Sequence, residues 1–449
     1  MKAEKSFSET IRASTPGRLE ELGIVGAGGG GFPTAAKFRT RVSTVIANAA
    51  ECEPLLHKDK ELLLHHSEPF LRGLLSAVEM VGAREGVIGI KEKYHEIIDA
   101  IGREVPAGIR VVPLPDVYPA GDEFILVHLV TGRVIPPGGL PKDVDCVVAN
   151  VETLMNIGLD RPVTHKYLTV AGAVAKPVSV RVPIGISIGE ISIGEVLEAA
   201  EGATVGEFGI LLGGVMMARP AADLEVPVTK TTGGIVVLPA SHALIRRHNA
   251  PWAQVQRIGR AACDQCRFCT EFCPRFLLGH PIEPHRAMQS LGFTSGSDSM
   301  VAGTLYCCEC NLCTLFSCPE DLDPKNVCVQ SKPLARERGL TFKGSPESVK
   351  PHPMADFRRV PMRRLIAKLG LGEFNNVGPL IEYDFAPRRV NIPLKQQAGA
   401  PAVPVVKCGD QVRAGDLVAV PEPGKLGARI HASIDGVVTV TENSIAIEA

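Results

Sequence analysis

The chain has 449 residues, a formal net charge of −1 and 22% charged residues. This length predicts roughly three domains, and the near-neutral charge provides no overall field that would favour nucleic acid or an anionic membrane. The longest strongly apolar run, Phe208–Ala218, is well short of the roughly 18 residues of a membrane span, and the N-terminus lacks the apolar segment of a secretory signal. We therefore expect a soluble, intracellular protein with no membrane span and no nucleic-acid partner.

A glycine-rich stretch, "GIVGAGGGGFPTAAKF", is the first motif along the chain. Gly26, Gly28 and Gly31 have the G-x-G-x-x-G spacing that lets a backbone turn approach a pyrophosphate. The residues before it predict a short helix, whereas the usual dinucleotide-binding turn follows a strand. From Pro33 onward the sequence predicts a helix start, where free N–H groups can meet an anion. We expect a phosphate-binding loop; a flexible linker is less favoured, because a helix and then a strand in "STVIANAAECEP" follow at once.

Three further blocks accompany this loop: "NAAECEP", "YPAGDE" (Tyr118–Glu123) and "ANVETLMN" (Ala149–Asn156). In this order they resemble the flavin-binding core of the NADH-oxidising subunit of respiratory complex I and of the C subunit of Rnf-type electron-transport complexes. The resemblance implies a Rossmann-like domain that holds the FMN phosphate, with NADH stacking on the flavin from the open side. The flavin-binding residues that it implies are Gly26, Gly28, Gly29, Gly31, Lys37, Asn48, Glu51, Gly121, Asp122, Glu123, Asn150 and Thr153.

The segment Tyr167–Ile191 alternates Val and Ile with Gly and Pro turns, and "SIGEVLEAAEG" (Ser192–Gly202) follows as a short helix. This pattern predicts a β-grasp unit. It resembles the soluble-ligand-binding β-grasp domain that follows the flavin domain in the same family. A structural spacer is the favoured interpretation over a ligand-binding role.

The first of two cysteine runs is "CDQCRFCTEFCP", with Cys263, Cys266, Cys269 and Cys273 before Pro274. Thirteen cysteines in a chain without a secretory signal are better interpreted as metal ligands than as disulfides. The C-x2-C-x2-C-x3-C-P spacing is that of bacterial ferredoxins. A zinc site is the alternative, but zinc sites usually pair two C-x-x-C units. We expect an iron–sulfur centre.

The second run, "CCECNLCTLFSCP", has Cys307, Cys310 and Cys313 at the same spacing, then four residues instead of three before Cys318. In two-cluster ferredoxins the fourth cysteine of each run ligates the other cluster. The predicted sets are therefore Cys263, Cys266, Cys269 and Cys318 for one [4Fe–4S] cluster, and Cys307, Cys310, Cys313 and Cys273 for the other. Cys308 stays open as the alternative to Cys307. The scattered thiols Cys52, Cys146, Cys328 and Cys408 are expected to be ordinary residues.

The C-terminal tail holds two β half-motifs, "QQAGAPAVPVVKCGDQVRAGDLVAVPEP" and "RIHASIDGVVTVTE". They resemble a biotinyl- or lipoyl-type barrel-sandwich hybrid. The connection between them lacks the context of a modified carrier lysine, so Lys425 is expected to be an ordinary surface residue.

The predicted fold is multidomain α/β and α+β, with a helical ferredoxin-like domain for two [4Fe–4S] clusters and a C-terminal barrel-sandwich hybrid. The predicted divisions are an FMN/NADH-binding domain at 15–160, a β-grasp domain at 161–239, the ferredoxin-like domain at 240–340, a linker region at 341–395 and the barrel-sandwich hybrid at 396–449.

In this order of modules the chain resembles the cobalamin reductases of propanediol-utilisation bacterial microcompartments. The resemblance implies electron transfer from NADH through FMN and two [4Fe–4S] clusters to cobalamin, with a corrinoid adenosyltransferase and shell proteins as partners inside a cytoplasmic microcompartment. NADH gives up two electrons as hydride and a cluster accepts one, so a flavin is the natural converter. Two alternatives remain: an Rnf C-like subunit that serves another acceptor, and a docking protein with structural clusters.

Overall fold

A four-stranded parallel sheet with the order β3-β2-β1-β5 forms the centre of the N-terminal part of this computed structural model, which describes residues 14–193, 208–293, 297–341 and 349–449. Strands β1, β2 and β5 are buried, apolar runs, as expected for a parallel sheet covered on both faces, whereas the edge strand β3 is partly exposed. The elements of this part are α1 (Pro16–Glu21), α2 (Thr34–Phe38), β1 (Thr44–Ala49), α3 (Lys58–His65), α4 (Ser67–Val81), β2 (Glu85–Lys91), α5 (His95–Glu104), β3 (Ile109–Leu114), β4 (Val117–Tyr118), α6 (Glu123–Thr131), η1 (Pro141–Val144), β5 (Cys146–Asn150) and α7 (Val151–Leu159).

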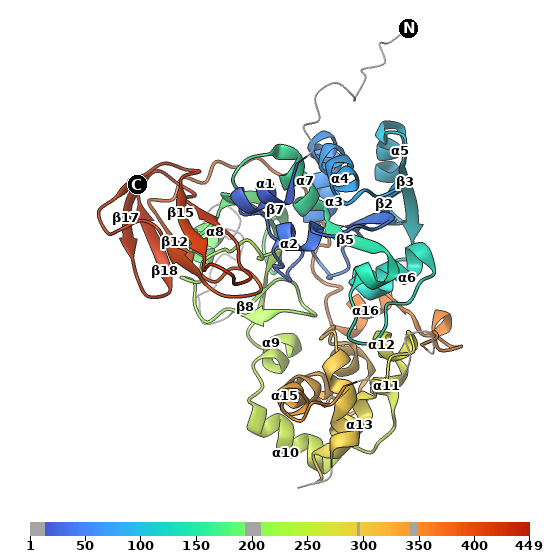
Figure 1. The fold of residues 1–449 in the computed structure, drawn as a ribbon. Coiled ribbons are helices and arrows are strands. Elements are labelled where there is room, and N and C mark those ends of the chain that lie inside the picture. The colour runs from blue at the N-terminus through green and yellow to red at the C-terminus, as the bar shows by residue number, and fades with distance from the viewer. Residues whose placement is uncertain (1–13, 194–207, 294–296, 342–348) are drawn as a thin grey trace.

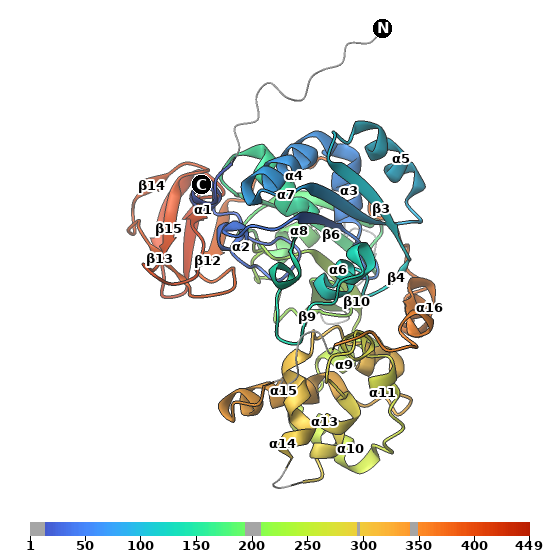
Figure 2. The same cartoon turned by 45° about the vertical axis from the view of Figure 1, so that its right-hand side comes forward.

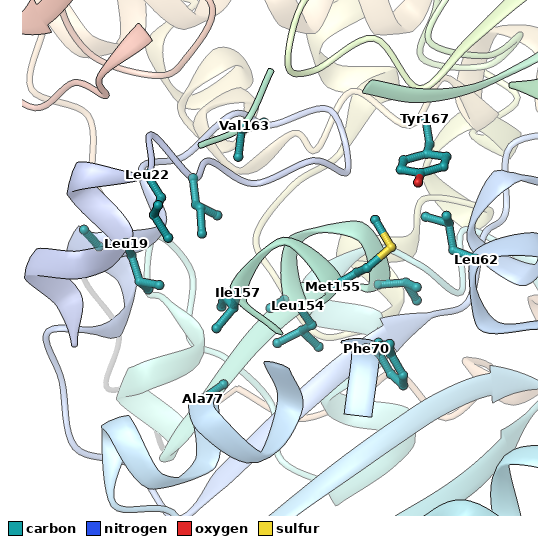
Figure 3. Close-up of a cluster of buried hydrophobic side chains, with 14 of the residues drawn as sticks. Leu19, Leu22, Leu62, Phe70, Ala77, Leu154, Met155, Ile157, Val163 and Tyr167 are labelled. Carbon is teal, nitrogen blue, oxygen red and sulfur yellow. The ribbon is translucent and has the colours of Figure 1, made fainter. Parts of the chain in front are cut away.

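The two faces of this sheet bury alternate residues of the same strand. Val45 and Ala47 of β1 pack into a core with α4 and α7, part of which Figure 3 shows around Phe70 and Leu154. Ile46 faces the opposite core, which α6 covers. The alternation follows from the two-residue period of a strand.

Helices α4 and α7 cross unusually closely beneath the sheet, and glycine makes this approach possible. A Cβ added at Gly73 would lie 1.8 Å from the Leu154 carbonyl oxygen, and one at Gly158 would lie 1.9 Å from the Pro69 carbonyl oxygen. Each helix has a residue suited to one of its termini. Asn150 caps the start of α7, and α4 ends at Gly82, whose φ is +66°. The crossing fixes α7, whose N-terminus points at the glycine loop.

The next module is a five-stranded sheet with the order β7-β6-β10-β8-β9. β6 pairs with β10 in parallel, and the other pairs are antiparallel, which fits the predicted β-grasp unit. The expected helix at Ser192–Gly202 lies outside the described residues from residue 194 onward. The elements are β6 (His165–Gly172), β7 (Val178–Pro183), α8 (Ile188–Ile193), β8 (Phe208–Leu212), β9 (Arg219–Pro220) and β10 (Gly234–Pro239).

Short helices around the two cysteine runs form a separate lobe, yellow to orange at the bottom of Figures 1 and 2. The extra residue before Cys318 is taken up by a π-helical turn, Cys313–Ser317, and π-turns commonly accommodate one inserted residue at functional sites. The elements are α9 (Ala243–His248), α10 (Trp252–Ala262), α11 (Phe268–Glu271), α12 (Pro274–Leu277), α13 (Pro284–Ser290), α14 (Asp298–Val301), η2 (Ala302–Tyr306), η3 (Cys313–Ser317) and α15 (Pro324–Glu337).

The segment predicted as a linker, 341–395, contains η5 (Asp356–Arg358), β11 (Val360–Pro361), α16 (Met362–Lys368) and β12 (Arg389–Pro393) in its described part. β11 pairs with β4 of the flavin domain. Leu365 and Leu371 enter an apolar core that also contains Leu55, Val236 and Cys310. This segment therefore joins three modules, and the exact domain boundaries stay a prediction.

The C-terminal module consists of two small sheets, β12-β18-β17-β14 and β13-β15-β16, at the left of Figures 1 and 2. Lys425 is exposed and pairs with Glu422 at 2.7 Å. In the described ranges no helix is long and apolar enough to cross a bilayer. The strands are β13 (Ala402–Pro404), β14 (Gln411–Val412), β15 (Leu417–Pro421), β16 (Ile430–His431), β17 (Gly436–Val440) and β18 (Ser444–Glu448), which complete the module with β12.

Candidate cofactor-binding sites

The glycine loop closes on itself between α1 and α2. Gly26 N–H donates to the Phe32 carbonyl at 2.9 Å, and Gly31 N–H donates to the Gly26 carbonyl at 3.1 Å. Gly29 has a φ of +100°, a conformation that glycine adopts at no steric cost. A Cβ added at Gly29 or Gly30 would meet no atom within 4 Å. The tip of the loop therefore faces open space, as a cradle for a bound group requires.

The start of α7 supports this loop from below. Ala27 N–H donates to Thr153 Oγ1 at 2.9 Å. Gly28 lies against Asn150, since a Cβ added there would be 3.4 Å from the Asn150 Cβ. Asn150 in turn caps α7 by accepting the Glu152 N–H at 3.0 Å. The loop is thereby fixed at the carboxyl end of β5.

The "YPAGDE" block is anchored to the same edge of the sheet. Lys37 Nζ donates to Glu123 Oε1 at 2.6 Å and to the Val148 carbonyl at 2.7 Å. Asn48 Nδ2 donates to the Gly121 carbonyl at 2.8 Å. Lys37 is thus held within the protein instead of standing free over the loop.

Two acidic residues complete this edge. Asp122 Oδ1 accepts the Phe124 and Ile125 N–H groups at the start of α6, at 3.1 and 3.2 Å. Burial, with a smaller contribution from the charge of Asp59, raises the pKa of Glu51 to about 7. A buried carboxyl with a raised pKa is a common feature of functional sites.

The twelve residues expected to bind flavin are therefore brought to one edge of the sheet. β1 lies between β2 and β5, so the strand order reverses there, and ligands of open parallel sheets bind at the carboxyl ends of strands at such a switch point. The open tip at Gly29 and Gly30 fits a bound phosphate. Asn150 and Thr153 hold this loop in place from the start of α7.

A buried network of charged side chains, which the sequence did not predict, lies beneath the loop. It consists of Lys58, Asp59, Glu152 and Lys166, each at most 3% exposed. Glu152 forms ion pairs with Lys166 and, at 3.4 Å, with Lys58. Lys166 Nζ also donates to the Ala27 carbonyl of the loop at 3.0 Å. Burial lowers the pKa of Lys166 to about 8, although Glu152 opposes the change. In the sequence, such residues stand out only as charges within otherwise apolar elements, such as Lys166 in the β6 sequence "HKYLTVAG".

Four cysteines line one small cavity in the helical lobe: Cys263, Cys266, Cys269 and Cys318. These are the members of the first predicted set, including the fourth ligand from the opposite run. Two sulfurs already accept hydrogen bonds: Gln265 Nε2 lies 3.2 Å from Cys263 Sγ, and Leu322 N lies 3.3 Å from Cys318 Sγ. Four sulfur donors around one cavity are the donor set that a [4Fe–4S] cluster requires. Across the described residues, no three Cys, His, Asp or Glu side chains are grouped so as to hold a single metal ion.

The two cysteine runs share a local backbone pattern that bears on Cys307 and Cys308. In the first run Gln265 and Arg267 have φ values of +60° and +70°. In the second run Glu309 and Asn311 have φ values of +61° and +67°. Since Glu309 follows Cys307 by two residues, as Gln265 follows Cys263, Cys307 occupies the position equivalent to Cys263. This pattern favours Cys307 as the ligand and leaves Cys308 as an additional thiol.

The second cysteine run touches the flavin motif directly. Tyr118 Oη donates to the Cys310 carbonyl at 2.8 Å, and both residues are buried. Asn311 Nδ2 donates to the Met216 carbonyl at 2.9 Å. Glu53, from "NAAECEP", accepts the N–H groups of three consecutive residues, 215–217. The second run is therefore built into the surface of the flavin and β-grasp modules.

Comparison with known proteins assigns three parts of the chain to families. Residues 19–159 match the Nuo51 FMN-binding domain, residues 262–323 the 4Fe-4S dicluster domain, and residues 378–448 the RnfC barrel-sandwich hybrid domain. The chain is thus an oxidoreductase that combines an FMN-binding domain with a domain for two [4Fe–4S] clusters. This confirms the predicted fold class and the flavin and cluster cofactors.

Relatives of similar length identify the family more narrowly. The chain is 42% identical to cobalamin reductase PduS of Citrobacter freundii over 100% of this chain and 98% of the relative. It is 43% identical to cobalamin reductase PduS of Salmonella typhimurium over 96% of this chain and 95% of the relative. A C subunit of an ion-translocating oxidoreductase complex from Pseudomonas aeruginosa is 33% identical over 58% of this chain and 33% of that subunit. The chain belongs to the PduS cobalamin reductase family.

Proposed function

We propose that this protein is an NADH-dependent reductase that delivers electrons through FMN and two [4Fe–4S] clusters to cobalamin. The observation that carries the proposal is the direct join between the two sites, in which Tyr118 of the flavin motif donates to the Cys310 carbonyl of the second cysteine run. Full-length similarity to cobalamin reductases of the PduS type names the acceptor. FMN supplies the conversion of a hydride into single electrons when bound.

The roles proposed for the chain's own residues follow from their contacts. The glycine loop accommodates the flavin phosphate because its tip is open, and Asn150 and Thr153 fix its position. Lys37 holds Glu123 at the same edge. The proposed flavin-binding residues are Gly26, Gly28, Gly29, Gly31, Lys37, Asn48, Glu51, Gly121, Asp122, Glu123, Asn150 and Thr153.

For the clusters we propose crossed ligation, because the cavity in the helical lobe is lined by cysteines from both runs. The first set is Cys263, Cys266, Cys269 and Cys318. The second set is Cys307, Cys310, Cys313 and Cys273, with the matching backbone of the two runs supporting Cys307 over Cys308.

The cellular setting is part of the same proposal. A cobalamin reductase keeps the corrinoid in the reduced state that adenosylation needs, so a corrinoid adenosyltransferase is the natural partner. The propanediol-utilisation microcompartment in the cytoplasm, with its shell proteins, is the proposed location.

The decisive experiment is an anaerobic spectrum of the reconstituted protein. We expect bound FMN and roughly eight irons, as two [4Fe–4S] clusters require. NADH should bleach the flavin and cluster absorption, and added cob(III)alamin should restore it while the corrinoid is reduced. Reduction by NADH without any transfer to cobalamin would contradict the proposed acceptor.

A second candidate, an Rnf C-like subunit that serves another acceptor, is favoured by the 30–33% identity to C subunits of ion-translocating complexes. The same reduced protein, mixed with oxidised ferredoxin in place of cobalamin, distinguishes the two. Faster reoxidation by ferredoxin would support this alternative.

A further inference from the structure

Arg275 lies between the flavin motif and the second cysteine run. It is in α12, two residues after Cys273, and is 7% exposed. Its Nη2 atom pairs with Asp122 Oδ2 at 2.9 Å. Its guanidinium carbon lies 3.5 Å from the centroid of the Phe124 ring. One buried cation therefore contacts two consecutive parts of the flavin domain, the residue that caps α6 and the first turn of that helix.

The other side of this guanidinium faces sulfur. The Cys308 and Cys310 thiols are, after Asp122, the groups whose charges act on Arg275. Nε and Nη1 of Arg275 are buried and form no well-aligned hydrogen bond, and the nearby Cys308 thiol is only a weak acceptor for the guanidinium. An unsatisfied buried donor destabilises the folded protein, and more so when the donor is charged. Two such donors beside one weak sulfur acceptor indicate that a stronger acceptor is missing at this position.

A [4Fe–4S] cluster at the second cysteine set would supply that acceptor. Its sulfurs and thiolate ligands carry negative charge, and hydrogen bonds to cluster sulfurs and nearby charge both set the reduction potential. Asp122 neutralises only one side of the guanidinium. A structural cross-link between lobes would need the Asp122 pair alone and would leave unexplained why two further N–H groups are buried beside sulfur.

We propose that Arg275 is a positioning residue that faces the second [4Fe–4S] cluster with its free N–H groups and raises the potential at which this cluster is reduced. The inference rests on the proposed function, since it requires a cluster at Cys307, Cys310, Cys313 and Cys273. One-electron reduction of the cluster adds one negative charge, and the buried cation stabilises that charge. Asp122 aims the guanidinium at the cluster and ties it to the flavin motif.

The test compares the reconstituted full-length wild type with Arg275→Gln and Arg275→Lys in anaerobic redox titrations followed by EPR. Each is also prepared with Cys266→Ala, which interrupts the first set and leaves the signal of the second cluster. At an applied potential near the wild-type midpoint, we expect the reduced fraction of the second cluster to fall several-fold in Arg275→Gln. Arg275→Lys keeps the charge and should remain close to the wild type.

Arg286→Gln is the matched control, because Arg286 lies in the same lobe, is substantially exposed and pairs with Glu283 at 3.5 Å. It should not shift the titration. Coincident titrations of wild type and Arg275→Gln, with equal iron content, would overturn the inference. Loss of the second cluster's iron in both Arg275 variants would also overturn it, in favour of a structural role. A wild type without the second cluster's signal would instead mean that the proposed function has failed.

Discussion

At the scale of single residues, the two glycines at the tip of the loop differ in their backbone conformation. Gly29 has a φ of +100°, whereas Gly30 is not among the residues with positive φ, and neither has an atom within 4 Å of an added Cβ. A side chain at Gly29 is therefore strained even though space is available. A side chain at Gly30 meets neither obstacle in the protein itself.

The first prediction compares these two positions. Gly29→Ala should weaken FMN binding by roughly 5- to 30-fold, because a non-glycine residue with positive φ costs about 1–2 kcal/mol. Gly29→Val should weaken it further by placing a branched side chain at the open tip. The dissociation constant is measured from the quenching of FMN fluorescence by apoprotein. Gly30→Ala adds the same methyl group to the tip without the positive φ, so it should weaken binding less than Gly29→Ala; equal affinities of Gly29→Val and wild type would remove the loop as the phosphate site.

The second prediction concerns the buried carboxylate of Glu152. Glu152→Ala leaves Lys166 buried with only the Ala27 carbonyl as acceptor, so we expect a loss of about 3–5 kcal/mol of unfolding free energy. The measurement is the thermal midpoint under anaerobic conditions. Glu448→Ala removes an exposed carboxylate that pairs with Arg389 at 3.6 Å, and it should change stability by less than about 1 kcal/mol. A similar midpoint for both variants would show that the buried network contributes little.

At the scale of elements, the π-turn Cys313–Ser317 reconciles two observations about the second run. The turn accommodates the one residue by which this run exceeds the ferredoxin spacing. Ser317 Oγ donates to the carbonyl of Leu312, the residue just before the turn, at 3.0 Å. Cys318 leaves the turn at the wall of the cavity that Cys263, Cys266 and Cys269 also line. The insertion therefore changes the local winding while the last cysteine still reaches the opposite set.

The third prediction tests this crossing. Cys318→Ala should abolish the cluster held by Cys263, Cys266 and Cys269 and reduce the iron content from roughly eight to roughly four atoms per chain. EPR of the reduced protein should retain the signal of the second cluster. The matched variant Cys273→Ala should produce the reverse loss. If Cys318→Ala removed only the cluster of Cys307, Cys310 and Cys313, each run would close on itself.

At the scale of the whole molecule, the C-terminal module takes part in holding the glycine loop. Lys230, which precedes β10, donates from Nζ to the Gly23 carbonyl at 2.7 Å and to the Arg429 carbonyl at 2.8 Å. Ala398 N–H donates to the Gly31 carbonyl at 3.0 Å. Three modules thus meet beside the loop, and the module that comes last in the sequence packs against the first motif.

The fourth prediction uses the charge of Lys230. Burial lowers its pKa to about 7, whereas the unfolded chain has a value near 10.4. Between these two pH values the unfolded state binds a proton that the folded state does not, so the unfolding free energy rises with pH by up to about 5 kcal/mol. Arg429 and His431 are the neighbouring basic groups; burial lowers the pKa of His431 to about 4, so His431 stays neutral over this pH range.

Lys230→Met removes this titration and should also lower overall stability, because two buried carbonyls lose their donor. The thermal midpoint of the wild type, measured relative to Lys230→Met, should increase steadily from pH 7 to pH 10. Lys425→Met, at an exposed lysine of the same junction, should show no such trend. A constant difference between wild type and Lys230→Met would mean that Lys230 stays charged in the folded protein.

By itself, the sequence determined the features that depend on neighbouring residues. The helix before the glycines, β1 with its acidic turn, the β-grasp alternation and the cysteine spacing all follow from local periodicity, turn chemistry and ligand spacing, and the resemblance to a flavin and iron–sulfur family followed from the order of these blocks. The family and the cofactors are confirmed, whereas the individual ligand residues stay predictions that the cavity and the loop geometry support.

Only the tertiary structure decided which distant residues meet. Ala27 binds Thr153, Lys166 reaches the glycine loop from the β-grasp module, and Arg275 joins the flavin motif to the second cysteine run. Local sequence patterns do not show these contacts, because each one joins residues that lie far apart along the chain. Their role arises from burial, since a charge removed from water must find its partner among whatever groups the packing of separate modules brings within hydrogen-bond distance.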